Sequence, residues 1–328
     1  MKIAVIENDK IIIKQAEDEK LGDRKGAIVK VLGCGLCGSD IVKFVHKIAK
    51  NGTVLGHEIV AKIVDINSDT DFKIGDEIVT SHHIPCGECV YCKHGNVSMC
   101  KHFKSTNIRP GGFSELVYLS EEHLQNVAHL KPENLTDIEA SFYEPLGCIV
   151  RAVKRANLLD GDEVLVVGLG SIGILTAQAL KAYGAKVTGC DLISERIDVL
   201  KSLEINALDV RTLSEENKFD AIYMTSGADK AIDTALKYVR NGGKIVVFSS
   251  TPHDETSYPN NEIYYRELTV MGSYSPAPAD LKDSLELLRT KKVKVKGLST
   301  EYKLDDIEQA FEDTMANRIM KAYIQVAS

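Results

Sequence analysis

The first 145 residues show the hydrophobic pattern of short β-strands. Runs of sheet-forming residues are broken by Gly, Asp and Asn, and apolar residues at helical spacing are rare. Patterns of this kind predict strands that are separated by turns. We therefore expect a β-rich region, with its clearest strands at residues 11–14, 27–31, 59–64, 77–79 and 113–119.

From about residue 160 the pattern changes to strands that alternate with helices. Residues 163–167 form a continuous apolar run, and the segment after it carries apolar residues three and four positions apart, from Ile172 to Ala182. This alternation predicts a parallel, doubly wound sheet. We expect the remaining elements at 186–190, 219–224, 244–248 and 268–271 for strands, and at 228–239 for a helix.

The C-terminal stretch is expected to contain a helix, a strand, a second helix at 307–316 and a final strand at 321–326. The pattern leaves open whether these elements extend the second domain or return to the first. Residues 291–296 alternate Lys with Val, which favours a strand with a solvated face over a basic binding patch. No low-complexity linker separates the two patterns, so we expect a rigid helical crossover near 145–160.

Composition and net charge argue against several classes of protein. The 328 residues suffice for two domains, and the net charge of −7 argues against a nucleic-acid or anionic-membrane surface. No apolar run approaches the ~18–20 residues that cross a bilayer, and the N-terminus lacks the apolar core of a signal peptide. We therefore expect a cytoplasmic protein. Eight cysteines in such a chain indicate metal binding or catalysis before disulfides.

Half of these cysteines form a C-x2-C-x2-C-x7-C motif. Thiolates at this spacing suit a closed, tetrahedral zinc site, which stabilises a lobe and does no chemistry. An iron–sulfur cluster uses the same ligands, and four unrelated cysteines are the plain alternative. The predicted structural zinc ligands are Cys86, Cys89, Cys92 and Cys100.

Three further segments carry candidate ligands for a second metal. Cys37 lies in G-L-C-G-S-D, His57 in G-H-E, and Glu144 in E-P-L. A thiolate, an imidazole and a carboxylate are a suitable ligand set for zinc. Each residue alone also has an ordinary interpretation, as a buried small side chain, a turn histidine and a charge at a helix N-terminus. Their separation in the sequence does not show that they meet.

A cofactor motif, G-x-G-x-x-G, follows the strand at 163–167 and opens the next helix. This context predicts a dinucleotide site with the pyrophosphate at the helix N-terminus. Asp191 ends the next strand, where a carboxylate accepts hydrogen bonds from the ribose and repels a 2′-phosphate, so we expect NAD rather than NADP or a flavin. Arg196 is the residue that could accommodate that phosphate. The predicted cofactor residues are Gly168, Gly170, Ser171, Ile172, Gly173, Asp191, Arg196, Ser226 and Ser249.

The ordered set of these motifs resembles the zinc-containing medium-chain alcohol dehydrogenase family. It is most similar to the sorbitol and threonine dehydrogenase branch, because E-P-L stands where other branches have a ligating Cys. The resemblance implies an α/β fold with a GroES-like β-rich catalytic domain and a Rossmann NAD-binding domain. It places residues 1–147 and 282–328 in the catalytic domain and residues 148–281 in the Rossmann domain.

The resemblance also assigns roles around the catalytic zinc. It implies that Cys37 and His57 are ligands, and that Glu58 and Glu144 bind the metal directly or through its water. Ser39 resembles the hydroxyl that takes the alcohol proton, and Asp40 resembles the carboxylate that orients the histidine. This chain departs from the family at Val42, where a His often ends the proton relay; Lys43, His46 or water are the alternatives. We expect Cys148 to be a packed helix residue and not a ligand.

These observations predict a zinc-dependent, NAD-linked dehydrogenase that oxidises a small secondary alcohol or a polyol such as sorbitol. Two zinc ions per chain and a homotetramer or homodimer are expected. An L-threonine 3-dehydrogenase-type activity is the nearest alternative. A zinc-free NADPH quinone reductase and a non-catalytic binding protein on the same fold are the others, and the four cysteines together with Cys37, Ser39, His57 and Glu144 argue against both.

Overall fold

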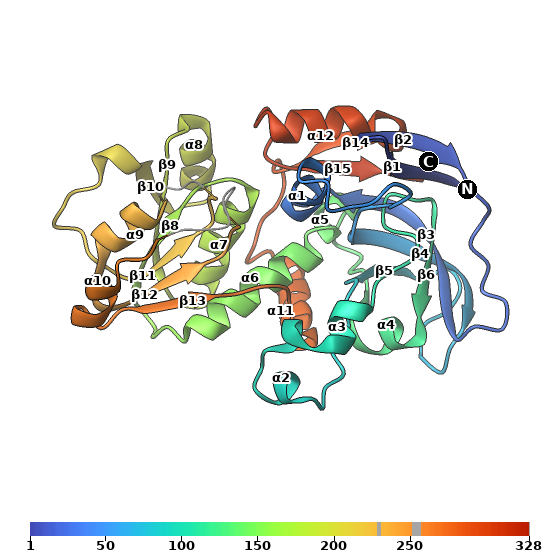
Figure 1. Cartoon of the computed structure of the whole chain (residues 1–328), viewed down its shortest axis with the longest axis horizontal. Coiled ribbons are helices and arrows are strands. Elements are labelled where there is room, and N and C mark those ends of the chain that lie inside the picture. Colours follow the sequence, from blue (N-terminus) through green and yellow to red (C-terminus); the bar gives the residue numbers. More distant parts are fainter. Residues whose placement is uncertain (228–230, 251–256, 328) are drawn as a thin grey trace. The chain divides into compact units, whose positions relative to one another are not determined.

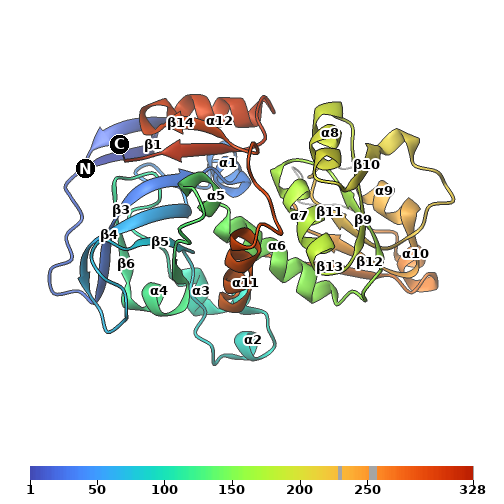
Figure 2. The same cartoon turned by 180° about the vertical axis from the view of Figure 1, so that it is seen from behind.

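The computed structural model describes residues 1–227, 231–250 and 257–327 and consists of two compact units (Figures 1 and 2). The first unit comprises Met1–Pro145, Ala277–Arg289 and Val295–Ser328. The second unit comprises Leu146–Pro276 and Thr290–Lys294. Among the described residues, no helix is both long enough and apolar enough to cross a membrane.

The first unit is built on a seven-stranded sheet and a two-stranded sheet. The small sheet pairs β1 (Lys2–Glu7) with β2 (Lys10–Gln15). In the large sheet, β6 pairs with one half of β3, and the other strands follow the order β14-β15-β3-β4-β5-β7. Its strands are β3 (Gly26–Gly35), β4 (Glu58–Asn67), β5 (Glu77–Thr80), β6 (Leu116–Ser120), β7 (Ala128–Leu130), β14 (Thr300–Lys303) and β15 (Ala322–Gln325).

The antiparallel register of this sheet brings three distant segments together. Gly35 at the end of β3 lies opposite Glu58 at the start of β4, and Tyr323 of β15 pairs with Gly35 from the other side. The chain leaves β3 directly into Leu36, whose N–H donates to the carbonyl of Ala322 (3.0 Å). The same corner of the sheet therefore holds residues from the beginning and the end of the sequence.

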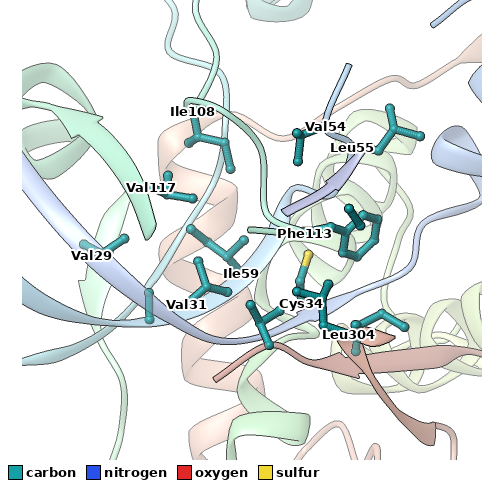
Figure 3. Close-up of a cluster of buried hydrophobic side chains, with 14 of the residues drawn as sticks. Val29, Val31, Cys34, Val54, Leu55, Ile59, Ile108, Phe113, Val117 and Leu304 are labelled. Carbon is teal, nitrogen blue, oxygen red and sulfur yellow. The ribbon is translucent and has the colours of Figure 1, made fainter. Parts of the chain in front are cut away.

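A hydrophobic core lies against this sheet (Figure 3). Val29 and Val31 of β3, Ile59 of β4 and Phe113 point into one cluster, and each is at most 1% exposed. Phe113 also meets Phe311 edge to face, at a centroid distance of 6.3 Å. Full burial of each such side chain contributes roughly 1.5–3 kcal/mol, so the core fixes the strands that carry the site.

Short helices are added to the sheets of the first unit. Those before residue 141 were not expected from the sequence pattern, whereas the two helices expected in the C-terminal stretch are present as α11 and α12. Most have fewer than nine residues, which is too short for a repeating apolar spacing. They are α1 (Gly38–Val45), α2 (Val90–Lys93), η1 (Val97–Met99), α3 (Lys101–Ser105), α4 (Glu121–Asn126), α5 (Asp137–Ala140), α11 (Pro278–Arg289), η3 (Leu304–Asp306) and α12 (Ile307–Met315).

The second unit contains a six-stranded, fully parallel sheet in the order β10-β9-β8-β11-β12-β13. The chain moves outward from β8 to β10 and then returns to β11 on the other side of β8. Ligands of such sheets bind at the carboxyl ends of the strands where this order reverses. The strands are β8 (Glu163–Val167), β9 (Lys186–Asp191), β10 (Asn206–Asp209), β11 (Phe219–Met224), β12 (Val239–Val247) and β13 (Thr269–Gly272).

Helices complete the alternating pattern, so the predicted doubly wound α/β sheet is confirmed. The expected crossover near 145–160 is helix α6, and the expected helix at 228–239 is described from Ala231, since 228–230 lie outside the described residues. The helices are α6 (Tyr143–Ala156), α7 (Ser171–Ala182), α8 (Ser194–Ser202), η2 (Val210–Thr212), α9 (Ala231–Tyr238) and α10 (Asn260–Tyr265).

The predicted strand at 291–296 is wrong. Val293 and Val295 are buried and the lysines between and beside them are exposed, but the segment joins no sheet. Its backbone is held by a side chain instead, because Lys294 N donates to Gln178 Oε1 (2.8 Å) and Gln178 Nε2 donates to the Lys294 carbonyl (3.0 Å). Residues 290–294 consequently belong to the second unit, whereas the predicted range 282–328 placed them in the catalytic domain.

Candidate active site

Three predicted ligands converge in the first unit. The ligand atoms of Cys37, His57 and Glu58 all lie within 4.8 Å of one another. Cys37 lies two residues after the end of β3, while His57 and Glu58 lie at the start of the antiparallel neighbour β4. The pairing of Gly35 with Glu58 explains the convergence, because it sets the end of one strand beside the beginning of the next.

A capping box fixes Cys37 at the N-terminus of α1. Its Sγ accepts from the N–H of Ser39 (3.5 Å), and its own N–H donates to Asp40 Oδ2 (3.3 Å). A capping side chain and an acidic first turn both favour a helix start at this position. The cap therefore orients the thiol of Cys37 and places the half-buried Ser39 in the first turn of α1.

Asp40 holds the imidazole of His57. Its Oδ1 lies 3.4 Å from Nδ1 of His57 and accepts weakly from the N–H of Gly56 (3.5 Å). Asp40 is fully buried; burial opposes its ionisation, but the neighbouring His57 lowers its pKa below the usual value. A histidine bound through Nδ1 to a carboxylate presents Nε2 to a metal. This is the arrangement expected for Asp40 from the sequence.

Glu58 has a partner that the sequence did not reveal. Lys321 Nζ lies 2.5 Å from Glu58 Oε2, and it also donates to the carbonyl of Leu36 (3.2 Å). Burial opposes the charge of Lys321, but Glu58 raises its pKa. A Cβ atom on Gly35 would lie only 2.0 Å from Glu58 Oε2, so this position needs glycine. The other oxygen of Glu58 has no hydrogen-bond partner among the described residues.

The donors present fit zinc. One sulfur, one imidazole nitrogen and one carboxylate oxygen make three protein ligands, and catalytic zinc sites keep a fourth position open. The unpartnered, buried oxygen of Glu58 is a further sign that a cation belongs here. Glu144 is buried in the first turn of α6 and is not part of the group of atoms within 4.8 Å. Its binding to zinc, directly or through water, stays a prediction.

Two histidines beside the group were also missed. The ring centroids of His57 and His82 are 4.5 Å apart, and those of His82 and His83 are 3.9 Å apart. Burial lowers the pKa of His82 well below its usual value, and that of His83 to about 4. Both rings are therefore neutral at physiological pH. The available signal was two adjacent histidines just before the four-cysteine motif.

The four cysteines of the predicted structural site lie in one loop around α2 and η1. The Sγ atoms of Cys89 and Cys92, and those of Cys86 and Cys100, are 3.5 Å apart, and Cys86 and Cys92 are 3.9 Å apart. Thiolates about 2.3 Å from a tetrahedral zinc are about 3.8 Å from one another. All four are free thiols, so the geometry fits a closed zinc site.

The glycine-rich turn lies where the cofactor motif predicts it, between β8 and α7. Helix α7 begins after Gly170 without a side-chain cap, so its first N–H groups remain available to an anion. An added Cβ at Gly173 would lie 1.8 Å from the carbonyl oxygen of Gly168, whereas one at Gly170 would meet no atom within 4 Å. The turn is thus closed on its inner side and open where a pyrophosphate would approach.

Asp191 is the last residue of β9, and its carboxylate holds the glycine-rich turn by hydrogen bonds. Its Oδ2 accepts from the N–H of Leu169 (2.6 Å), and its Oδ1 accepts from the N–H groups of Leu192 (2.7 Å) and Ile193 (3.0 Å). Arg196 Nη1 lies 3.7 Å from Oδ2. The carboxylate therefore has a structural role in addition to the ribose contact predicted for it, and the arginine is already paired with it.

The other predicted cofactor residues lie at the carboxyl ends of neighbouring strands. Ser226 lies against Gly168, and Ser249 Oγ donates to the carbonyl of Met224 (3.4 Å). Thr225, which the sequence did not single out, donates to the carbonyl of Gly168 (2.7 Å) and holds the turn from β11. These positions agree with a site at the point where the strand order reverses, while their contacts with a cofactor stay predictions.

Comparison with known proteins identifies the family. The alcohol dehydrogenase GroES-like domain matches residues 23–129, and the zinc-binding dehydrogenase domain matches residues 171–290. Sorbitol dehydrogenase of Halalkalibacterium halodurans is 31% identical over 314 residues, which cover 90% of each chain. The probable D-xylulose reductase A of Aspergillus clavatus is 29% identical over 329 residues, covering 93% of this chain and 90% of the relative.

Solved structures share the fold. Alcohol dehydrogenase TADH from Thermus sp. ATN1 superimposes with a TM-score of 0.87 at 23% identity and covers 100% of both chains. The chain therefore belongs to the zinc-containing medium-chain alcohol dehydrogenase family, in its sorbitol dehydrogenase-like branch. The predicted family, fold class, enzyme class and the cofactors zinc and NAD are confirmed.

Proposed function

We propose that this enzyme oxidises a secondary hydroxyl group of a small polyol to a ketone and transfers the hydride to NAD. The convergence of Cys37, His57 and Glu58 on one point, within 4.8 Å of one another, carries the proposal. Relatives named for sorbitol and D-xylulose, both polyhydroxylated compounds, support the substrate class. The alcohol carbon loses a hydride to the nicotinamide, and the hydroxyl loses a proton.

The residues of the first unit have separate proposed roles in the reaction. Cys37, His57 and Glu58 would hold zinc, with Glu144 contributing directly or through water. Zinc bound there supplies a Lewis acid that lowers the pKa of an alcohol hydroxyl. Asp40 keeps His57 in the orientation and tautomer that the metal needs.

The proton is proposed to leave through Ser39. Ser39 is half-buried, and its backbone N–H donates to the thiol of Cys37 (3.5 Å), which fixes its position next to this ligand. Val42 cannot relay a proton, and its side chain is 36% exposed. His46 ends α1 at the exposed surface. We therefore propose that Ser39 passes the proton to solvent water at this position.

The second unit would bind NAD. The open side of Gly170 and the uncapped first turn of α7 would receive the pyrophosphate, and Asp191 would accept from the ribose hydroxyls. Cys86, Cys89, Cys92 and Cys100 would bind the second zinc and stabilise their loop. The proposed stoichiometry is thus two zinc ions per chain.

We also propose that the enzyme is a cytoplasmic homodimer or homotetramer. Free thiols 3.5–3.9 Å apart, as in the four-cysteine loop, persist in a reducing compartment. In the part of the chain that the structure describes, β13 is an edge strand with one side unpaired, and Tyr264 and Tyr265 on α10 are 72% and 77% exposed. An exposed strand edge and exposed aromatic side chains both favour association.

A substrate panel tests the proposal. The zinc-loaded protein is mixed with NAD and sorbitol, xylitol, 2,3-butanediol or threonine, and NADH formation is followed together with zinc content. Oxidation of the polyols with two zinc ions per chain is expected. Oxidation of threonine alone would favour the threonine dehydrogenase alternative. A single zinc ion and no turnover would favour a binding protein, and turnover without zinc would favour a quinone reductase-like enzyme.

A further inference from the structure

A small cavity in the first unit adjoins the proposed catalytic centre. It encloses about 210 Å³, and Asp40 and His57 form part of its wall. Pockets for drug-sized ligands measure about 300–1,000 Å³, so this cavity suits a small molecule. The other polar groups that line it are Lys43, Thr53, His82 and Asn107.

Lys43 is the cation of this cavity. It is half-buried on α1, and its carbonyl accepts from the N–H groups of Ile48 (3.0 Å) and Ala49 (3.1 Å), which fixes its backbone. Among the described residues, its ammonium group forms no ion pair or hydrogen bond. It is close enough to lower the pKa values of Asp40 and His82 through its charge. Lys43 therefore brings an ammonium group without a hydrogen-bond partner to the wall that also contains Asp40 and His57.

His82 supplies a second observation that points to a ligand. Its side chain is buried, with 9% of the residue exposed, and its Nδ1 has no hydrogen-bond partner among the described residues. A buried polar atom without a partner costs about 1–3 kcal/mol. The ring is held between His57 and His83, and the His82 carbonyl meets Nε2 of His123 at 3.2 Å. A hydroxyl group of a bound ligand would satisfy Nδ1.

The cavity wall carries one carboxylate, from Asp40, and one ammonium group, from Lys43, and of the two only the ammonium group lacks a hydrogen-bond partner among the described residues. Asp40 is the acidic residue of the lining, and His57 already engages its carboxylate at 3.4 Å. Lys43 has no such partner, while Thr53, Asn107 and His82 offer hydroxyl, amide and imidazole groups. Neutral donors and acceptors suit the hydroxyl groups of a polyol, and an unpaired ammonium suits a charged oxygen.

We propose that this cavity receives the end of the polyol remote from the oxidised carbon, and that Lys43 selects substrates whose remote end carries a phosphate or carboxylate. The inference rests on the function proposed above and narrows its substrate class to anionic polyols. The reaction itself is unchanged: the secondary alcohol carbon is oxidised, and the nicotinamide is reduced.

The experiment compares three probes on the full-length, zinc-loaded enzyme: sorbitol, sorbitol 6-phosphate and gluconate. The three probes share a polyhydroxylated six-carbon chain and differ in the terminal group. The effect of a phosphate and the effect of a carboxylate are therefore measured separately, each against neutral sorbitol. Values of kcat/KM with NAD are measured for the wild type, Lys43→Met and Lys43→Glu. Lys47→Met is the matched control, because Lys47 lies on the adjacent turn, pairs with Asp9 (2.6 Å) and does not line the cavity. Binding of each probe is measured separately by calorimetry.

The wild type is expected to prefer at least one anionic probe over sorbitol by tenfold or more in kcat/KM and in affinity. Lys43→Met should reduce this preference at least tenfold, Lys43→Glu should reduce it further, and Lys47→Met should change it less than twofold. Equal preference for sorbitol and both anions in the wild type, or a preference that survives in Lys43→Met, would overturn the inference and leave the proposed function standing. Failure of all three probes and of xylitol to reduce NAD would overturn both.

Discussion

The ammonium group of Lys321 lies 2.5 Å from a carboxylate oxygen of Glu58, and both side chains are almost completely buried. Lys321 directly precedes β15, whereas Glu58 begins β4, and β3 runs between these strands in the sheet. Removal of two charges from water costs several kcal/mol per ion, which their attraction offsets only when both are present. The pair therefore ties the last strand of the chain to a proposed zinc ligand.

The substitution Lys321→Met tests the strength of this coupling. It leaves the carboxylate of Glu58 buried without its cation, and loss of one partner of a buried pair typically costs about 3–5 kcal/mol. We expect the free energy of unfolding of the zinc-free protein to fall by about this amount. Urea denaturation followed by circular dichroism measures the change.

The double variant Glu58→Gln/Lys321→Met is the control for this prediction. It removes both charges together and should recover part of the stability that Lys321→Met loses. If Lys321→Met were as stable as the wild type within about 0.5 kcal/mol, which is the range of ordinary surface substitutions, the pair would be unimportant.

Cys37→Ser should abolish activity while the fold remains intact. The hydroxyl of Ser is a poor substitute for a thiolate as a zinc ligand, so one of the two zinc ions should be lost. Activity with NAD, zinc content and the thermal unfolding curve are measured together. Cys148→Ser is the matched control, since Cys148 lies half-buried in α6 and is expected to keep full activity and both zinc ions. Full turnover by Cys37→Ser would refute the assigned site.

Cys89→Ser should affect stability more than cofactor binding. Loss of one of four thiolates opens the proposed structural site, and each kcal/mol lost lowers Tm by about 2–4 °C in a unit of 150–250 residues. We expect a fall in Tm of several degrees, the loss of one zinc ion and a KM for NAD within twofold of the wild type. Glu88→Gln, on the neighbouring exposed residue, serves as the control. An unchanged Tm would count against a structural metal in this loop.

Asp191→Gly should shift cofactor preference toward NADP. The substitution removes the carboxylate that repels a 2′-phosphate and releases Arg196, now 3.7 Å from Oδ2, to pair with that phosphate. We expect the NADP to NAD ratio of kcat/KM to rise at least tenfold. The KM for NAD should also rise, because Leu169 N loses its hydrogen bond to Oδ2 (2.6 Å).

Asp209→Gly provides the comparison for the cofactor prediction. Asp209 ends the neighbouring strand β10 and engages Arg211 rather than the glycine-rich turn. Its replacement should leave the cofactor ratio unchanged within twofold. A ratio that stays constant in Asp191→Gly as well would remove Asp191 from the role proposed for it.

Local features of the site could be predicted from the sequence. The turn between β8 and α7 depends on glycines that are close in sequence, and the four-cysteine loop places all its thiols within 15 residues. In both cases the spacing of the residues already determines much of the geometry. The alternation of strands and helices after residue 160 likewise predicted the parallel sheet, because burial on both faces leaves continuous apolar runs.

Features that depend on contacts between distant segments could not be predicted. No pattern around Lys321 indicates that it will meet Glu58, since the contact arises from the order of strands in a completed sheet. The 291–296 segment shows the opposite case, because its pattern predicted a strand that does not form. Its alternation of Lys and Val reflects real alternation of burial, but a side chain, Gln178, supplies the hydrogen bonds that a strand would have made.

The position of β15 between β14 and β3 has a consequence for biosynthesis. Residues 146–276 of the second unit leave the ribosome before residue 322 is made, and units of a nascent chain generally fold as they emerge. Until β15 is available, β3 lacks one neighbour and Glu58 lacks its counter-ion. The metal-binding unit of the nascent enzyme therefore stays incomplete, with one edge of β3 open and the carboxylate of Glu58 unpaired, until residues 321–325 have emerged from the ribosome.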